Sequence, residues 1–490
     1  MNGLRRILSN TGISFIGQMV TWLSTLALTI AYGRFLHGDT FGELVYVVSF
    51  VALVGFPIEF SFNQQIVRDV AQNSSRALSY PLNVLLLKAT LWAVMFSASL
   101  LISGALGFNP DERFLLVACG ATLLIDAVGT TFGSVQTAAQ RQAFPALGLV
   151  IERGLGAIVA ILWLRIGGGI YAAGLALVGG ALAGTTWQLF WFIRLVGVRL
   201  RIDLGLIRDL VRQSLPFLTY GVLGVIYYRI DTVLLEALTG TAVVGVYGAA
   251  YRLFDTLVFL PNIVILAVMY PIMAKLSVNS ERQLKIAIEK SVNFLLVAGI
   301  PIMVGLIVAA PNILGFLYHR SDFSVGSVPV LRALAPGLAI LYLNSVWTTA
   351  LMSLKLEKRL PWMAAAALVV NIGGNLLLIP RLEGVGAAIM TSLTELLLMA
   401  LSLSMLPRHI LSVSSLVTGL KALGASLAMA LVVSLRSHDP LAVIIPVAVF
   451  VYILIATILA TIPREDLVAL YKAIAQRTRT VAPAVNTPAP

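Results

Sequence analysis

Apolar runs that recur from one end of the sequence to the other decide what this chain can fold into. Each run has about 20 residues, enough to cross a hydrocarbon core of ~30 Å as an α-helix. Hydrophobic residues make up 59% and charged residues 11% of the 490 residues, and this composition excludes a set of soluble domains. A period of two residues does not dominate, so a transmembrane barrel is not indicated. We therefore predict an all-α polytopic membrane protein.

The apolar runs predict about fourteen transmembrane helices. The first run follows Arg5 and Arg6 and is longer than the core of a signal peptide, so we predict a retained helix rather than a cleaved leader. The predicted spans are 7–36, 41–62, 80–107, 113–139, 146–166, 168–194, 215–238, 243–272, 287–310, 328–354, 361–380, 384–406, 418–435 and 440–462.

Lysine and arginine residues are distributed unequally over the predicted loops. With a cytoplasmic N-terminus, about 24 of the 34 fall on the cytoplasmic side, Arg153 among them, and six fall on the opposite side. By the positive-inside rule, both termini are cytoplasmic. The net charge of +12 is then mainly a signal of topology with some attraction to anionic lipid, and we do not expect a nucleic-acid partner.

Two pairs of similar segments indicate an internal repeat that divides the chain into two lobes of six helices. Both lobes have one orientation, so a pseudo-twofold axis along the membrane normal relates them. Residues 33–46 resemble 236–247, and residues 167–177 resemble 382–393. The predicted parts are an N-lobe with helices 1–6 (1–198), a cytoplasmic amphipathic linker (199–214), a C-lobe with helices 7–12 (215–406), helices 13 and 14 (407–464), and a partly disordered cytoplasmic tail (465–490).

Several passages carry a family resemblance. They are LPFLTYGVLGVIYYRIDTVLLEAL and VVGVYGAAYRLFDTLVFLPNIVILAVMYPIMAKL in the centre, KRLPWMAAAALVVNIGGNLLLIPRLEGVGAAIMTSLTE at 358–395, and LSNTGISFIGQMV, GDTFGELVYVVSF and NQQIVRDVA near the start. By these passages the chain resembles the polysaccharide and O-antigen flippases, in the superfamily that also contains the multidrug and toxin extruders and the lipid II flippases. None of the passages is a catalytic signature.

The resemblance implies two lobes around a central cavity that alternates between inward-open and outward-open states. The implied cargo is an undecaprenyl-pyrophosphate-linked oligosaccharide, carried from the cytoplasmic to the outer leaflet of a bacterial inner membrane for surface polysaccharide biosynthesis. We expect a functional monomer surrounded by membrane lipids, with polysaccharide polymerase and assembly proteins as candidate partners. No cofactor is expected, and the sequence leaves open whether an ion gradient, the membrane potential or product consumption drives transport.

Charged residues interrupt the apolar sequence between Tyr227 and Pro261. Ionised side chains in a spanning helix are costly and usually face a bundle interior or a watery cavity. Arg229 and Arg252 each lie roughly 13 Å below the predicted outer surface, at one depth on neighbouring helices, as recognition of a pyrophosphate requires. The alternative is an Arg–Asp clamp that holds two helices together. The candidate cargo-binding residues are Arg229, Arg252, Asp231, Asp255, Arg332 and Arg34.

Four other charged residues are candidates for gating or ion coupling. Glu59 and Lys88 belong to spans that should pack together, and a structural ion pair is the alternative to an inner gate. Asp126 and Glu395 are lone acids near mid-membrane that can titrate, bind a cation or serve as hydrogen-bond partners. Pro261 and Pro271 are the predicted hinges, because a proline removes a backbone hydrogen bond and can bend its helix.

The sequence favours a transporter over an enzyme. It has no nucleotide-binding glycine loop, nucleophile elbow or hydrolase carboxylate pair, and the predicted outer loops are too short for a glycosyltransferase or polymerase site. The single cysteine, Cys119, excludes a disulfide framework, and no metal site is predicted because the histidines lie apart in loops, at His37, His319, His409 and His438. A cation-coupled drug exporter of the same superfamily and a non-transporting scaffold remain alternatives.

Overall fold

The computed structural model describes residues 2–59, 62–73, 77–197, 202–258, 269–318, 321–407 and 414–461, with positions 261 and 265. Of residues 2–16, 59, 215–221 and 321–324 it describes the backbone alone. The described residues form fifteen α-helices and no strand, which confirms the predicted all-α class. The predicted tail, His319 and His409 lie outside the described residues.

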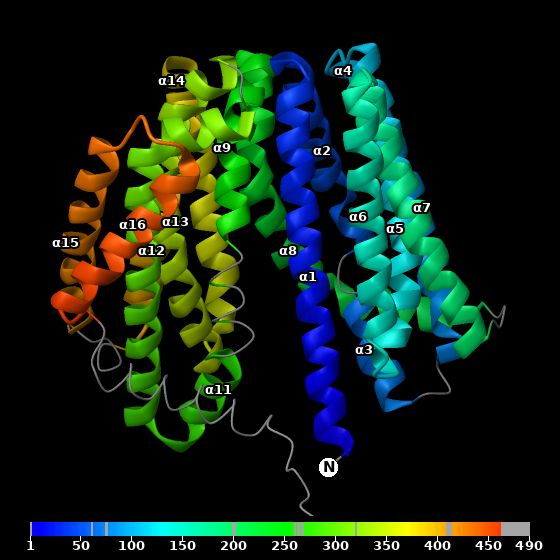
Figure 1. Ribbon diagram of the computed structural model, residues 1–490. Coiled ribbons are helices and arrows are strands. Elements are labelled where there is room, and N and C mark those ends of the chain that lie inside the picture. The colour runs from blue at the N-terminus through cyan, green and yellow to red at the C-terminus, as the bar shows by residue number, and fades with distance from the viewer. Residues whose placement is uncertain are drawn as a thin grey trace, which may run out of the picture. The chain divides into compact units, whose positions relative to one another are not determined.

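Short connections join most of the helices (Figure 1). Their bounds are α1 (Asn2–Phe35), α2 (Gly38–Glu59), α3 (Phe62–Gln72), α4 (Tyr80–Ala105), α5 (Pro110–Ala138), α6 (Ala143–Arg165), α7 (Gly169–Leu195), α8 (Leu204–Thr239), α9 (Thr241–Leu257), α11 (Tyr270–Asn279), α12 (Glu281–Tyr318), α13 (Ser321–Ser353), α14 (Leu360–Met405), α15 (Ser414–Leu435) and α16 (Leu441–Ile458), with a short 3-10 helix at Glu357–Arg359.

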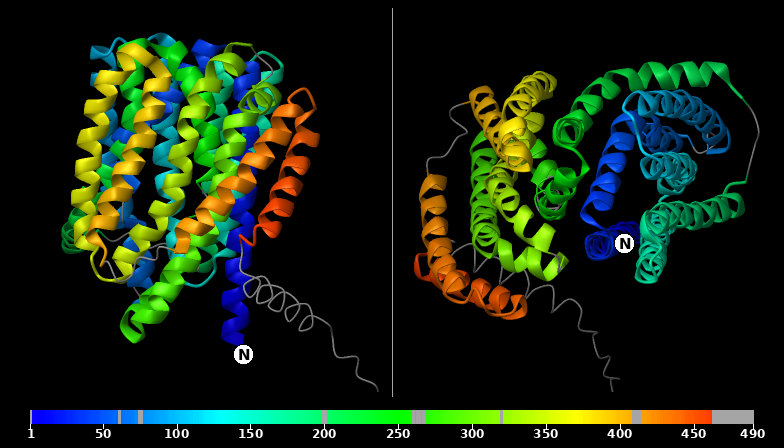
Figure 2. Two further views of the ribbon diagram at one scale, coloured as in Figure 1. Left: turned by 90° about the vertical axis from the view of Figure 1, so that its left-hand side faces the viewer. Right: turned by 90° about the horizontal axis from the view of Figure 1, so that it is seen from above.

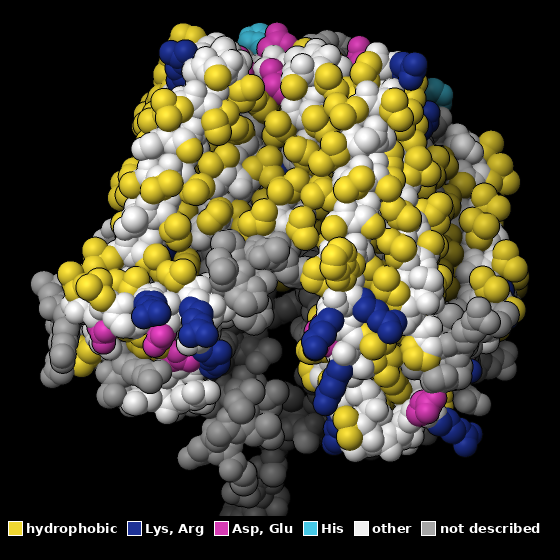
Figure 3. All heavy atoms as spheres, turned by 180° about the vertical axis from the view of Figure 1, so that it is seen from behind, with side chains coloured by type: hydrophobic (Ala, Val, Ile, Leu, Met, Phe, Trp, Pro, Cys, Tyr) yellow, Lys and Arg dark blue, Asp and Glu magenta, His cyan; other side chains and the backbone are white. Residues whose placement is uncertain are grey.

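Ten helical segments among the described residues are long and apolar enough to cross a membrane. The other predicted spans fall on α1, α8, α9 and the second half of α14. Figure 3 shows hydrophobic side chains along the lengths of the helices, with most of the Lys and Arg side chains of this face toward one end. The chain is therefore a multi-pass membrane protein, and the count of fourteen spans stays a prediction.

Helix α14 is a hairpin of two antiparallel arms. Its backbone leaves the helical conformation at Glu383, which has φ 49° and ψ −131°. A Cβ built on Gly386 would lie only 2.7 Å from the carbonyl oxygen of Leu378, and farther from the bend the Asn371 amide donates to the Thr394 hydroxyl over 3.2 Å. These pairings reverse the chain at Glu383, so α14 contains the two predicted spans 361–380 and 384–406.

Helix α8 joins the predicted linker to the predicted seventh span without a break. The Asp203 carboxylate caps its start by accepting from the Leu206 N–H over 3.1 Å. Its end is followed by a single residue, Gly240, whose φ of 92° suits glycine, and α9 begins directly afterwards. The connection between the predicted spans 215–238 and 243–272, four residues long in the prediction, is therefore one residue long in the structure.

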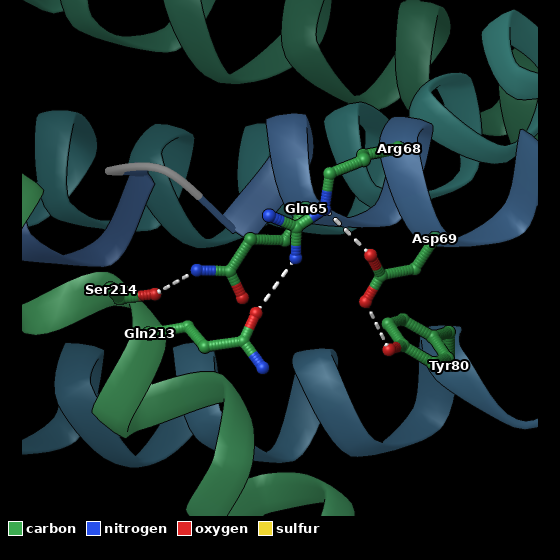
Figure 4. Close-up of polar contacts among 6 residues, drawn as sticks. All are labelled: Gln65, Arg68, Asp69, Tyr80, Gln213 and Ser214. Atoms are coloured by element: carbon green, nitrogen blue, oxygen red, sulfur yellow. Dashed lines mark hydrogen bonds and ion pairs between the residues drawn. The ribbon is translucent and has the colours of Figure 1, made fainter. Parts of the chain in front are cut away.

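Two hydrogen bonds tie the first turns of α8 to α3 (Figure 4). The Gln65 amide donates to the Ser214 hydroxyl over 2.6 Å, and the Arg68 guanidinium donates to the Gln213 amide oxygen over 2.7 Å. Arg68 also contacts the Asp69 carboxylate, with Nε 2.8 Å from Oδ1. Side-chain contacts therefore fix this amphipathic segment on the helices beside it.

The chain divides into two compact units by its internal contacts. The first unit contains Met1–Leu257, Leu314–Leu334 and Lys358–Thr394, and the second contains Val258–Ile313, Ala335–Glu357 and Glu395–Pro490. Buried side chains of α3, α4, α5, α7 and α8 form one apolar core in the first unit. In the second unit, α12 packs against α15 and α16. The division into an N-lobe and a C-lobe stays a prediction.

Helices α2 and α9 of the first unit touch through their backbones. A Cβ built on Gly245 would lie 2.5 Å from the carbonyl oxygen of Gly38 and 3.3 Å from the Gly42 nitrogen. Helices approach this closely only where small residues face each other. The contact places α9, which carries two of the predicted cargo-binding residues, directly beside α2.

Candidate functional site

A cavity of about 220 Å³ lies inside the first unit, and five charged residues line it. Helices α1, α2, α5, α6, α7, α8 and α9 contribute to its wall. The charged lining residues are Glu152, Arg153, Arg229, Arg252 and Asp255. With three guanidinium groups and two carboxylates, the wall has one positive charge in excess.

Arg229 of α8 and Arg252 of α9 share this cavity with Asp255. Asp255 follows Arg252 by three positions, so the two residues lie on one face of α9. The backbone therefore brings together the two arginines that the sequence places at one depth. Each guanidinium group carries five N–H donors that a ligand in this cavity can use.

The third arginine comes from α6 and was not among the predicted site residues. Arg153 lies next to Glu152, with its Nε 3.0 Å from Oε1 of the carboxylate. The Glu152 side chain is 12% exposed and that of Arg153 is 45% exposed, so the guanidinium is the accessible member of the pair. Both residues lie in the predicted span 146–166, and the rule that intramembrane charges mark functional sites would have found them.

Hydroxyl groups complete the wall of the cavity. Tyr32 is 6% exposed, and its hydroxyl finds no hydrogen-bond partner among the described residues. Because an unpartnered buried hydroxyl is unfavourable, a ligand that bonds it gains affinity. Thr25 and Thr29 of the same helix and Thr232 of α8 also line the cavity.

Asp231 is not part of the cavity wall, although its two hydrogen-bond partners line it. It is 3% exposed, and its carboxylate accepts hydrogen bonds from the Tyr247 hydroxyl and from the Thr232 N–H, the latter over 2.8 Å. The bond from Tyr247 joins α8 to α9. Asp231 thus connects the two helices through a tyrosine and not through the Arg–Asp pair of the alternative, and its role in cargo binding stays a prediction.

Two of the predicted cargo-binding arginines also lie outside the cavity. Arg34 binds the end of α12, where its Nε donates to the Leu317 carbonyl over 2.7 Å and its Nη2 to the Phe316 carbonyl over 2.8 Å. These are carbonyls that a helix C-terminus leaves unpaired. Arg332 is exposed on α13 and is not part of the cavity wall.

Lys88 of α4 is completely buried, and its ammonium contacts oxygen atoms of two other helices, α3 and α5. Its ammonium lies 3.0 Å from the Asn63 amide oxygen, 3.2 Å from the Thr130 hydroxyl and 3.4 Å from the Ala127 carbonyl. Asp126 precedes Ala127 on α5 and is half-buried. The predicted partner, Glu59, has its side chain outside the described residues.

Glu395 is buried in the second unit. The Asn344 amide donates to its carboxylate over 2.7 Å and to its carbonyl over 2.9 Å, which joins α13 to α14. Of the predicted hinges, Pro271 occupies the first turn of α11, where a proline fits without bending a helix. Pro261 is buried, and most of its neighbours in sequence are outside the described residues. Roles in gating, coupling and bending stay predictions.

The cavity can bind an anion that also carries hydroxyl groups. Arginine meets phosphate oxygens with two parallel hydrogen bonds, and carboxylates and hydroxyls can bond to sugar hydroxyls. At about 220 Å³ the cavity is smaller than the ~300–1,000 Å³ typical of small-molecule sites, so in this conformation it holds only part of a large headgroup.

Solved structures share the fold of the chain. A lipid II flippase, MurJ, in an inward closed conformation aligns with a TM-score of 0.75 and 14% sequence identity, over 93% of this chain and 99% of that one. An inward-facing multidrug resistance MATE family transporter of the MOP superfamily aligns with a TM-score of 0.64 and 14% identity, over 78% of this chain and 92% of that one. At these identities the likeness concerns the fold alone.

Sequence comparison identifies relatives directly. A probable flippase, AglR of Haloferax volcanii, is 28% identical over 185 residues, so the match spans 38% of this chain and 39% of that protein. Residues 7–277, more than half of the chain, match the family model described as polysaccharide biosynthesis protein. The chain therefore belongs to this polysaccharide biosynthesis family.

Proposed function

We propose that the protein flips a lipid-linked oligosaccharide across the membrane by alternating access, with the headgroup held in the cavity of the first unit. The proposed cargo is an undecaprenyl-pyrophosphate-linked oligosaccharide, moved from the cytoplasmic to the outer leaflet of a bacterial inner membrane. The observation that carries this proposal is the convergence of Arg153, Arg229 and Arg252 on one cavity. Membership of the polysaccharide biosynthesis family supports it.

The physical task of a flippase is to replace the hydration of a polar headgroup while the headgroup passes through hydrocarbon. A pyrophosphate needs cationic donors, and three guanidinium groups supply up to fifteen N–H donors, five each. Glu152 holds the Arg153 guanidinium, and both Glu152 and Asp255 offer acceptors for sugar hydroxyls. The unpartnered Tyr32 hydroxyl adds a donor and an acceptor.

A transfer assay with reconstituted protein tests the proposal. The cargo is a fluorescent undecaprenyl-pyrophosphate oligosaccharide, and the readout is its appearance in the opposite leaflet. Each hydrogen bond to a charged group contributes ~1.5–3 kcal/mol, so Arg229→Gln with Arg252→Gln should slow transfer roughly 100-fold at low cargo concentration. The matched control is Arg113→Gln with Arg165→Gln, which removes the same charge from exposed residues outside the cavity.

Normal transfer by a folded Arg229→Gln, Arg252→Gln variant would refute the proposed headgroup site. Extrusion of cationic dyes by the parent protein, without any lipid transfer, would instead favour the cation-coupled drug exporter. A variant with Arg153→Gln that keeps Arg229 and Arg252 measures the contribution of α6 to cargo binding. We expect it to bind cargo more weakly than the parent and more tightly than the double variant.

A further inference from the structure

The first turns of α8, residues 204–214, run across the ends of the helices of the first unit. In the right-hand view of Figure 2, this part of the green helix lies in the plane of the picture, while most helices are seen end-on. Leu206 and Leu210 pack into the apolar core formed with α3, α4, α5 and α7. Gln213 and Ser214 add the hydrogen bonds to α3 seen in Figure 4. One face of the segment is thus fully engaged with protein.

The two carboxylate residues at the start of α8 are exposed and border a second cavity. Asp203 and Asp209 line this cavity, of about 460 Å³, together with Asp69 and Tyr80. Tyr80 donates to the Asp69 carboxylate over 2.5 Å, so the cavity is a polar, hydrogen-bonded environment. The two arginines of the segment are not part of that cavity wall. Negative and positive side chains therefore lie on different sides of the helix.

The remaining face carries an alternating set of apolar and basic residues. Leu204, Arg208, Val211 and Arg212 are spaced i, i+4, i+7 and i+8, which places them in one stripe along the helix. Leu204 is 76% exposed and Val211 is 41% exposed, and both arginines are exposed. We call these four residues the outward stripe.

We propose that the outward stripe binds anionic phospholipids of the leaflet on the predicted cytoplasmic side. Arg208 and Arg212 would meet lipid phosphates, and Leu204 and Val211 would enter the boundary between headgroups and acyl chains. This combination of basic and apolar residues on a helix lying across the spans is the pattern of an interfacial helix. A purely aqueous face would not need the leucine and valine, and a purely hydrocarbon face would exclude the arginines.

Charge complementarity identifies the lipid. Zwitterionic headgroups carry no net charge, whereas an anionic leaflet attracts each nearby Lys or Arg by ~1 kcal/mol. That value converts to about fivefold for each arginine, so the two together should enrich anionic over zwitterionic lipid up to about 25-fold beside the stripe. The inference is independent of the proposed cargo, because its readout is lipid composition and not transport.

The test places a fluorophore on the stripe of the full-length protein. Cys119 is the single cysteine and is buried, so Cys119→Ala followed by Leu204→Cys gives one labelling position. The protein is reconstituted into nanodiscs, and the label is quenched by spin-labelled phosphatidylglycerol or by spin-labelled phosphatidylcholine at equal mole fraction. We expect severalfold stronger quenching by phosphatidylglycerol, and nearly equal quenching by the two lipids after Arg208→Gln with Arg212→Gln.

Two further variants keep the result interpretable. Arg208→Lys with Arg212→Lys keeps the charge of the stripe and should keep the lipid preference. Arg113→Gln with Arg165→Gln removes equal charge elsewhere in the first unit and should also leave the lipid preference unchanged. The inference is overturned if the preference survives in Arg208→Gln with Arg212→Gln, or if the control removes it equally. Absence of quenching by either lipid would also overturn it and would favour an acidic protein segment on this face.

Discussion

The backbones of Gly42 in α2 and Thr241 in α9 are so close that a Cβ on Gly42 would lie 1.9 Å from the Thr241 carbonyl oxygen. Gly42→Ala should therefore force α2 and α9 apart. Overpacking of this kind costs ~1–3 kcal/mol, and we expect a lower midpoint of thermal unfolding in detergent. Gly104→Ala is the control, since nothing lies within 4 Å of a Cβ at that position. An unchanged midpoint for Gly42→Ala would show that the helices separate freely.

Adjacent glycines of α7 offer a matched pair for testing the cavity wall. A Cβ on Gly180 would lie 2.5 Å from the carbonyl oxygen of Glu152, whereas a Cβ on Gly179 meets nothing within 4 Å. Gly180→Ala should push α6 outward, displace Arg153 and reduce cargo transfer severalfold. Gly179→Ala should leave transfer unchanged and gain up to ~1 kcal/mol of helix stability. Equal transfer by both variants would contradict a role for α6 in cargo binding.

Removal of the Tyr247 hydroxyl should destabilise the protein. Tyr247→Phe leaves the buried Asp231 carboxylate without its donor from α9, at a cost of ~1–3 kcal/mol. Asp231→Asn in the same background should recover part of the loss, because a neutral amide is less costly to bury than a carboxylate. A double-mutant cycle on the unfolding midpoint measures the coupling. Tyr171→Phe is the control, since Tyr171 donates to Asp111 at an exposed site.

Substitution of Arg34 should affect stability and not cargo binding. Arg34→Gln removes the two charged hydrogen bonds to the end of α12, so we expect a loss of ~1.5–3 kcal/mol in unfolding free energy. Transfer per folded molecule should equal that of the parent. A fall in cargo affinity with unchanged stability would instead restore Arg34 as a cargo-binding residue. Arg165→Gln, an exposed arginine at the end of α6, is the control.

The sequence predicts much of this fold because the bilayer imposes a simple rule on it. Apolar runs of spanning length have to be helical. Each of the fourteen predicted spans falls on a helix of the described chain, apart from a few described residues at the span ends. The same rule makes Arg229, Arg252 and Asp255 visible as charged exceptions. The rule on intramembrane charges applies equally to Glu152 and Arg153. The count of positive charges, however, assigns Arg153 to the cytoplasmic side, so Arg153 is not recognised as an intramembrane residue.

Contacts between distant parts of the chain are beyond this kind of prediction. The sequence shows Arg34 near the end of a span, but not that its guanidinium reaches carbonyls 282 and 283 positions away. It shows Asp231 two residues from Arg229, but not the hydrogen bond that the Asp231 carboxylate accepts from the Tyr247 hydroxyl. It also cannot show that the linker and the seventh span form a single helix, since both patterns are helical and no residue between them ends the helix.

The bend of α14 at Glu383 has a consequence for biogenesis. The two arms meet with no hydrophilic loop between them, so the membrane insertion machinery has almost nothing to translocate at this point. Neither arm can then be released into the bilayer as an independent segment, and the pair must enter together as a hairpin already folded on itself. Epitope tags placed at this bend would add the very loop that the chain lacks, and with it a separate translocation step.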